Sequence, residues 1–465
     1  MNIQRTLLLS TVLSVYLFFP FEVGINLFAF DSALLLLLLR QRKELNASAP
    51  IRWATFCLLA SAVAVVIVHS RAAIVAHHLS FVLLVGYAQR RELRFVWYAL
   101  LLGGWSLLSG PLRAYREWVA SQPLSNRLLT ARKWGVPITV ALLICLPFLL
   151  LYAGGNGAFL DSVDFVLEGV WRRIDLGSII KLALLTVLGG TIAAALFYPD
   201  QAMQSPFNDG EAADRLERQR GTGAGTLPRL LTLYRTALLV FASVNVLLAF
   251  VNLTDLRFIW LPAQQVSAAT LSEYVHAGTH ALVGSMLLAM VLVLFFFRGS
   301  LNFYSRARPL RILVYVWLAQ NAVLALSVGV RNWHYVAAYG LAFGRIHVAF
   351  ALGLILAGLF SLYVKVRRRY TLRFVFQTNA LVAWLLLVAY GGINWSGVIT
   401  RINLQQPDHR IDWKYLVDDL DRENDFLLRR EGHRLPDPLR RRVEGRSGGP
   451  STIRGWNYAD WRNAR

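Results

Sequence analysis

The chain has 465 residues, of which 56% are apolar and only 16% are charged, and its formal net charge is +21. Soluble domains average about 45–50% apolar and about 25% charged residues, so this composition excludes an ordinary soluble domain. The basic residues stand in short loops between apolar runs. This placement is typical of a membrane protein that follows the positive-inside rule, and it argues against a nucleic-acid-binding protein.

Long apolar runs with few charges follow one another up to residue 394. A helix needs about 20 mostly apolar residues to cross the hydrocarbon layer. Such runs predict membrane spans at 6–21, 23–39, 53–68, 72–88, 95–110, 135–153, 176–198, 230–251, 275–297, 310–330, 343–364 and 374–394. We therefore expect an all-α, polytopic transmembrane helix bundle of about 11–12 spans, within a transmembrane domain that covers 1–394.

Two segments between these runs have the mixed composition of helices that lie at a membrane surface. Residues 112–134 combine several basic side chains with Trp118, and residues 156–175 combine acidic side chains with Trp171. Charged and aromatic residues on one amphipathic segment favour the headgroup region, so both segments are predicted to be interfacial. The polar, glycine-containing segment 199–228 is predicted to be a loop.

The basic loops set up a conflict about orientation. They lie at 40–52, 89–94, 110–134, 298–311 and 365–373. The positive-inside rule places basic loops on one side of the membrane, but strict alternation through twelve spans cannot do so here. The conflict is relieved if the weak run 95–110 is re-entrant or interfacial. That reading gives eleven spans and places the C-terminal tail on the side opposite to 365–373.

The last part of the chain, 395–465, is polar and is expected to form a C-terminal tail beyond the transmembrane domain. Within it, Trp413, Leu416 and Leu427 recur at helical spacing. This periodicity predicts one amphipathic helix over about 412–431.

An ionisable side chain at membrane depth is a functional candidate by default, because the bilayer disfavours charge. Asp31 lies inside the run 23–39 and is interpreted as a proton or cation site. The alternative is a neutral or paired carboxyl that fixes helix packing, with Lys181 or an arginine as its partner. His77 and His78 stand near a helix start and are expected to be structural or interfacial.

Glu273, His276 and His280 are spaced so that they share one face of a helix. Glu-x-x-His is a spacing used in dinuclear metal bundles, so a metal or haem site is one interpretation. The alternative places Glu273 and His276 at the wet start of the span and leaves His280 alone in the core. Because no second Glu-x-x-His is present, we predict no metal site.

Asn245 and Asn252 are seven residues apart and share a face of the span 230–251. Amide side chains inside a bundle commonly form hydrogen bonds between helices. Helix packing is therefore the first interpretation of this pair, and a polar pathway is the second.

A cluster of polar and basic residues flanks the short segment between two late spans. Its members are Arg331, His334, Tyr339, Arg345 and His347. Arginine presents a planar fork that suits phosphate or carboxylate, so the cluster is a candidate site for an anion or a lipid headgroup. The alternative is that both arginines extend toward the membrane surface from the ends of neighbouring helices.

Several segments resemble elements of a known family. They are LSEYVHAGTHALV from Leu271, RNWHYVAAYGLAFGRIHV at 331–348, INWSGVITRINL at 393–404, IDWKYLVDD at 411–419 and GWNYADWRNAR at the C-terminus. Together they resemble a bacterial multi-pass membrane family catalogued as domain of unknown function 4153/4173. The resemblance implies many transmembrane helices and a short polar tail, without an established activity. His276 and Ala342 depart from the family pattern, which has Arg and Thr there, so no family role is carried over to them.

No HExxH or CxxC motif occurs, and we predict no catalytic residue and no cofactor. The leading hypothesis is a transport or permease-like component of the bacterial inner membrane. The alternative is a membrane sensor or scaffold subunit that acts through a membrane or periplasmic protein partner. A weaker alternative is an interfacial lipid- or glycan-modifying enzyme. Membrane lipids are expected partners, and nucleic acid is not.

Overall fold

The computed structural model describes residues 3–19, 23–90, 93, 95–120, 176–198, 215–216, 226–255, 284, 286–297, 300–446 and 456–463. Within these ranges the regular structure is helical, apart from one antiparallel bridge between Arg215 and Tyr370. The fold is therefore all-α, as the hydropathy pattern predicts.

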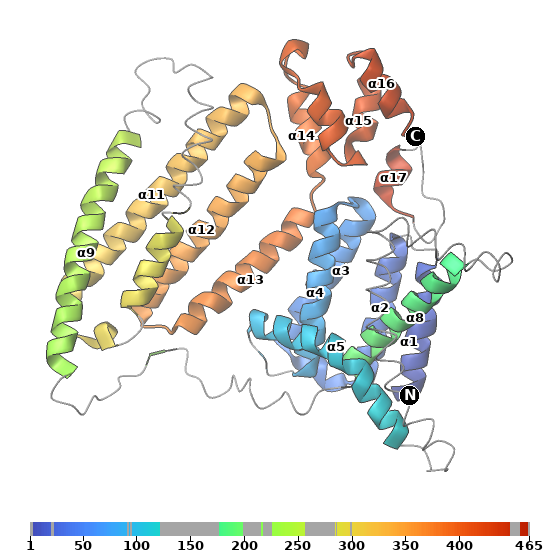
Figure 1. The fold of residues 1–465 in the computed structure, drawn as a ribbon, viewed down its shortest axis with the longest axis horizontal. Coiled ribbons are helices and arrows are strands. Elements are labelled where there is room, and N and C mark those ends of the chain that lie inside the picture. Colours follow the sequence, from blue (N-terminus) through green and yellow to red (C-terminus); the bar gives the residue numbers. More distant parts are fainter. Residues whose placement is uncertain are drawn as a thin grey trace, which may run out of the picture.

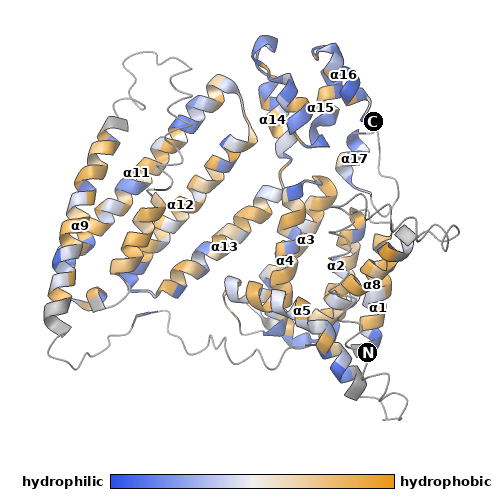
Figure 2. Ribbon diagram, viewed as in Figure 1, coloured by the Kyte–Doolittle hydropathy of each residue, from blue (hydrophilic) through white to orange (hydrophobic). Residues whose placement is uncertain are grey.

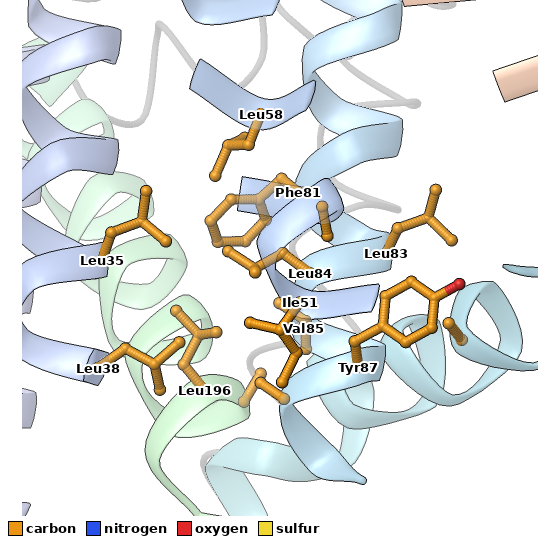
Figure 3. Close-up of a cluster of buried hydrophobic side chains, with 14 of the residues drawn as sticks. Leu35, Leu38, Ile51, Leu58, Phe81, Leu83, Leu84, Val85, Tyr87 and Leu196 are labelled. Carbon is orange, nitrogen blue, oxygen red and sulfur yellow. The ribbon is translucent and has the colours of Figure 1, made fainter. Parts of the chain in front are cut away.

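The first half of the chain forms a helix bundle that we call the N-terminal bundle (Figure 1). Its elements are α1 (Ile3–Phe18), α2 (Ile25–Gln41), the 3₁₀ turn η1 (Lys43–Ala47), α3 (Ala49–Ile67), α4 (Arg71–Gln89), α5 (Val96–Ala120) and α8 (Leu176–Phe197). Leu38, Leu58, Leu84 and Leu196, from four different helices, are buried together in its core (Figure 3). Apolar side chains therefore fill the interior of this bundle.

A second bundle follows in the chain. It consists of α9 (Thr226–Asp255), the helix Met286–Phe296, the 3₁₀ turn η4 (Ser300–Phe303), α11 (Arg308–Tyr339) and α12 (Phe343–Arg368). Phe241, Phe297 and Trp317 are buried in its core.

Helix α13 (Leu372–Gly391) runs between the two bundles (Figure 1). Toward the N-terminal bundle, the Trp384 indole N–H donates to Ser80 Oγ at 2.9 Å. Toward the second bundle, Asn379 Nδ2 donates to Ser361 Oγ at 2.9 Å. One helix thus connects the two bundles through a specific polar contact on each side.

Among the described residues, seven helices are long and apolar enough to cross a membrane. They are Ala49–Ile67, Arg71–Gln89, Ile180–Phe197, Leu230–Leu253, Arg308–Tyr339, Phe343–Arg368 and Leu372–Gly391. Helices α1 and α2 have 16 and 17 residues, and Met286–Phe296 is the described end of the expected span 275–297. The expected span 135–153 and the segment 156–175 lie outside the described residues. The chain is a multi-pass membrane protein.

Helix α5 lies across one end of the N-terminal bundle. A Cβ atom at Gly86 or Gly103 would overlap backbone atoms of the facing helix, so glycine allows α4 and α5 to touch directly. Farther along α5, Arg113 Nε donates to Tyr198 O at 3.0 Å, just beyond the end of α8. Because α5 contacts only the last turns of both neighbours at these points, it does not run to the opposite end. This agrees with a re-entrant or interfacial run 95–110, although 112–120 continues the same helix.

The described parts of four basic loops meet at one end of the two bundles, which we call the basic end (Figure 1). The turns α2–α3, α4–α5, η4–α11 and α12–α13 all lie there. Two contacts tie the bundles together at this level: Val96 N donates to Gln377 Oε1 at 2.6 Å, and the Arg373 guanidinium lies 4.1 Å from the centre of the Phe95 ring. The described parts of four basic loops therefore lie on the same side of the two bundles, while most of the fifth, 110–134, lies outside the described residues.

The polar residues after α13 form a small helical domain at the opposite end (Figures 1 and 2). We call 395–446 and 456–463 the C-terminal domain. It contains α14 (Trp395–Asn403), η5 (Asp408–Arg410), a π turn η6 (Tyr415–Asp419), η7 (Arg422–Asn424), α15 (Asp425–Arg430), α16 (Asp437–Glu444) and α17 (Tyr458–Asn463). Ile399, Leu416 and Leu428 are buried in its own core.

The single amphipathic helix expected over about 412–431 is wrong. The chain is extended at Leu420 and Asp421, which separates η6 from η7 and α15. The buried Asn424 side chain donates to Leu416 O at 2.9 Å and to Thr400 Oγ1 at 2.8 Å. The segment folds back because its apolar residues pack against α14 and α16, and a straight helix cannot bring them to both.

Candidate functional site

The candidate site is a buried carboxyl–imidazole pair in the N-terminal bundle. His77 Nε2 lies 2.7 Å from Asp31 Oδ2, and the two side chains are only 5% and 1% exposed. At this distance the two atoms share one proton, which is held either by the imidazole nitrogen or by the carboxyl oxygen. The pair can therefore exist as an ion pair or as two neutral groups.

Helix geometry brings the two residues to the same depth. Asp31 and His77 each stand six residues after the first residue of their helices, α2 and α4. At a rise of 1.5 Å per residue, both lie about 9 Å below the helix ends on the side of the C-terminal domain. The pair thus belongs to the half of the bundle nearer that domain.

The second nitrogen of His77 has no partner among the described residues. Its Nδ1 atom is buried and accepts or donates no hydrogen bond there. The neighbouring His78 is exposed, and its Nδ1 donates to Ile74 O at 2.7 Å. The two imidazole rings meet edge to face with centroids 5.3 Å apart. His77 therefore joins a buried acid on one side to an exposed titratable ring on the other.

The identity of the partner corrects one expectation. Asp31 is paired, but with His77 and not with an arginine or with Lys181, which is exposed on α8. His77, expected to be structural or interfacial, lies in the interior of the bundle, which leaves the structural alternative open. The pairing could have been predicted from the sequence, because a buried acid requires a partner at its own depth. His77 stands at the same position in α4 as Asp31 does in α2.

Asn245 and Asn252 belong to a polar contact between α9 and α11 in the second bundle. Asn245 Nδ2 donates to Leu313 O at 2.9 Å, and Asn252 Nδ2 donates to Gln320 O at 3.1 Å. Gln320 Nε2 also donates to Asn245 Oδ1 at 2.9 Å. The equal sequence offset of the first two bonds means that the helices run parallel. These bonds support the packing interpretation.

The polar cluster between α11 and α12 lies near the C-terminal domain. Helix α11 has 32 residues, so it is about 48 Å long and exceeds the hydrocarbon thickness of about 30 Å. Arg345 Nη1 donates to Tyr339 O at 3.0 Å and to Gly340 O, and its guanidinium stacks 4.3 Å from the Tyr335 ring centre. Arg345 therefore caps the last carbonyls of α11. The anion site remains a prediction.

The other members of this cluster do not meet at one point. His347 Nε2 lies 3.0 Å from the Tyr390 hydroxyl on α13. His334 and Tyr339 are exposed, and Arg331 is half-buried. The structure brings Arg345 next to Tyr339 but directs His347 toward a different helix.

The same loop is held by the C-terminal domain. Asn403 Oδ1 accepts from Leu341 N at 2.7 Å, and Asn403 Nδ2 donates to Leu341 O at 2.9 Å. The Tyr415 hydroxyl accepts from Phe343 N at 2.9 Å. Gly340 has a φ of 78°, which a residue with a side chain rarely adopts. The segments 331–348, 393–404 and 411–419, which carry the family resemblance, thus form one interface.

The C-terminal domain also contacts the N-terminal bundle. Ile25 N donates to Trp456 O at 2.9 Å, and Arg71 Nε lies 3.7 Å from Asp421 Oδ1. Beside this contact, burial raises the pKa of Glu423 to about 7. The C-terminal domain therefore touches both bundles above the Asp31–His77 pair.

Glu273 and His280 lie outside the described residues, so the structure does not place them. In the part of the chain that the structure describes, no group of three or more His, Cys, Asp or Glu side chains could hold a metal ion.

The model of the family described as "Domain of unknown function (DUF4153)" matches residues 27–429. This match includes the Asp31–His77 pair, the loop around Gly340 and most of the C-terminal domain. No curated protein and no solved structure matches the chain.

Proposed function

Because the chain belongs to the family of domain of unknown function DUF4153, whose description names no activity, we propose a function from the structure. The protein is a transport protein of permease type, and the Asp31–His77 pair carries the proton that couples transport. The single observation that carries this proposal is the buried 2.7 Å contact between the two side chains.

The energetics of burial support a functional role for this pair. An isolated charge in the membrane interior is costly, so ionisable groups there are rare and are usually paired with one another. A packing role alone is served by uncharged side chains, as in the asparagine contacts of α9 and α11. A carboxyl and an imidazole can in addition exchange a proton near neutral pH.

The position of the pair supports access from the side of the C-terminal domain. The pair lies about 9 Å from the helix ends on that side, and the exposed His78 ring touches His77 edge to face. Toward the basic end, the same helices are packed by leucine side chains such as Leu38 and Leu84 (Figure 3). A proton bound at the pair therefore has its shorter path toward the side of the C-terminal domain, with leucine packing on the other side.

Proton flux into liposomes loaded with a pH-sensitive dye tests the proposal. The full chain is reconstituted and an imposed pH gradient is followed with and without a membrane potential. Asp31→Asn and His77→Gln are expected to abolish the protein-dependent flux. Ser61→Ala is a matched control, because Ser61 is equally buried in the N-terminal bundle and bonds only to Leu58 O of its own helix. Flux that survives both pair variants refutes the role of the pair.

We place the protein in the bacterial inner membrane with the basic end toward the cytoplasm. The positive-inside rule supports this orientation, because four basic loops converge at that end. A reporter fused after residue 465 is expected to be active only outside the cytoplasm.

A second candidate function is a sensor or scaffold that acts through a protein partner. The observation that favours it is the C-terminal domain, which binds the α11–α12 loop through Asn403 and the N-terminal bundle through Trp456. A ligand or partner that moves this domain would act on both bundles at once. Purification from native membranes in mild detergent separates the two functions: a stoichiometric partner favours the scaffold, and a chain purified alone opposes it.

A further inference from the structure

The turn from α12 to α13 at the basic end gathers arginine side chains on one surface. Arg367, Arg368 and Arg369 follow one another and are all exposed. Arg369 adopts the left-handed conformation, with a φ of 57°, so the helix ends abruptly. The nearby Lys365 points the other way, since its buried Nζ donates to Phe297 O at 2.6 Å. The three arginines are therefore held at the surface by the turn.

A fourth arginine reaches this turn from a remote part of the chain. Leu216 N donates to Arg369 O at 2.8 Å, and Arg215 forms an antiparallel bridge with Tyr370. The Tyr370 hydroxyl accepts from Arg368 Nη1 at 3.5 Å. Arg368 first, and Arg215 to a smaller extent, lower the pKa of Tyr370, so both positive charges act on this one hydroxyl.

In the part of the chain that the structure describes, no acidic side chain forms an ion pair with any of these four arginines. The described acidic residues of the basic loops are Glu44, whose Oε1 lies 3.2 Å from Arg42 Nε, and Glu117, which lies on α5. Like charges that share a surface repel each other, and the repulsion is relieved when an anion binds between them. Arginine forks match the oxygens of a phosphate group in particular.

Aromatic contacts place the turn at the level of lipid headgroups. The Arg369 guanidinium lies 5.4 Å from the Phe303 ring centre in the second bundle, and Arg373 lies 4.1 Å from Phe95 and 5.2 Å from Tyr98 in the N-terminal bundle. Basic and aromatic side chains gather together at the membrane–water interface. The phosphate group present in quantity at that level belongs to a phospholipid.

We propose that the α12–α13 turn, with Arg215, Arg367, Arg368 and Arg369, is a binding site for the headgroup of an anionic phospholipid. Because the stacking partners of this turn come from both bundles, a bound lipid lies at their junction at the basic end. The lipid therefore stabilises the folded protein in addition to binding it. This inference does not depend on the proposed transport activity.

The test compares two triple variants of the full chain in nanodiscs. R367Q/R368Q/R369Q removes three charges at the turn, and R440Q/R441Q/R442Q removes three consecutive charges from the C-terminal domain at the opposite end. Nanodiscs are made of phosphatidylcholine with increasing fractions of phosphatidylglycerol. Bound phosphatidylglycerol is counted by native mass spectrometry, and thermal unfolding is measured in parallel.

Phosphatidylglycerol is expected to raise the unfolding temperature of the wild-type chain and of the C-terminal variant. In R367Q/R368Q/R369Q the affinity is expected to fall roughly 100-fold, from about 1 kcal/mol for each basic residue near an anionic surface. The single variant R368Q serves if the triple variant does not fold, with a loss of roughly fivefold on the same basis. Equal lipid binding by both triple variants overturns the proposal. So does displacement of the lipid by millimolar inorganic phosphate, which would indicate a free anion.

Discussion

The replacement of His77 by Ala gives the sharpest test of the buried pair. The side chains of Asp31 and His77 are 1% and 5% exposed, so the variant leaves a carboxyl without its partner in the bundle interior. Breaking a buried pair by removing one partner costs about 3–5 kcal/mol, whereas an exposed ion pair contributes about 0.2–1 kcal/mol. If the stranded Asp31 takes up a proton, the cost falls to that of an unsatisfied buried polar group, about 1–3 kcal/mol. The expected loss of stability therefore lies between about 1 and 5 kcal/mol.

A double-mutant cycle separates the contact from the loss of packing. His77→Ala, Asp31→Leu and the double variant are unfolded reversibly in mixed micelles, with tryptophan fluorescence as the signal. The double variant leaves no stranded polar group, so its cost is expected to be at least about 1 kcal/mol smaller than the sum of the single costs. Costs that add within about 0.5 kcal/mol would show that the two residues do not interact, and would refute the reasoning.

Three further predictions concern the C-terminal domain and the α4–α5 contact. Burial raises the pKa of Glu423 from 4.5 to about 7, so the folded protein holds a proton that the unfolded chain releases. The free energy of unfolding is therefore highest below pH 4.5 and falls by about 3 kcal/mol as pH rises through 7. Glu423→Gln is expected to remove this pH dependence from unfolding curves. Asn403→Ala leaves the half-buried N–H and C=O of Leu341 unpaired, and is expected to cost about 1–2 kcal/mol and to speed hydrogen exchange in the loop. Unchanged exchange would contradict this. Gly86→Val places a Cβ on the backbone of α5 and is expected to lower the free energy of unfolding by about 1–3 kcal/mol, which reduces the yield of folded protein in size-exclusion chromatography. The control Gly104→Ala, whose Cβ meets nothing within 4 Å, is expected to leave that yield unchanged.

Much of the membrane architecture could be read from the sequence. The predicted spans 72–88, 310–330 and 343–364 each fall within a helix that is long and apolar enough to cross a membrane, and 53–68 extends one residue beyond such a helix. Hydropathy works here because hydrocarbon disfavours charge at every position, so the composition of each helix alone shows that it spans the membrane. The all-α class follows for the same reason, since a helix satisfies its backbone hydrogen bonds within its own segment.

The candidate site could be predicted only in part. Asp31 stands out in the sequence because it is an acid in an apolar run, but its partner is 46 residues away on a different helix. The arginine cluster is similar: Arg367 to Arg369 are adjacent in sequence, whereas Arg215 is added by a backbone bridge that no local pattern indicates.

The composition of the chain by itself determined that helices cross a membrane and which side chains are out of place there, because the transfer of each residue into hydrocarbon depends on that residue alone. The tertiary structure decided what those side chains meet. It paired Asp31 with His77, assigned Arg345 to the last carbonyls of α11, and folded 412–431 back on itself around Asn424. A buried polar group is satisfied by whichever donor or acceptor packing brings within about 3 Å, and that depends on the arrangement of several helices at once.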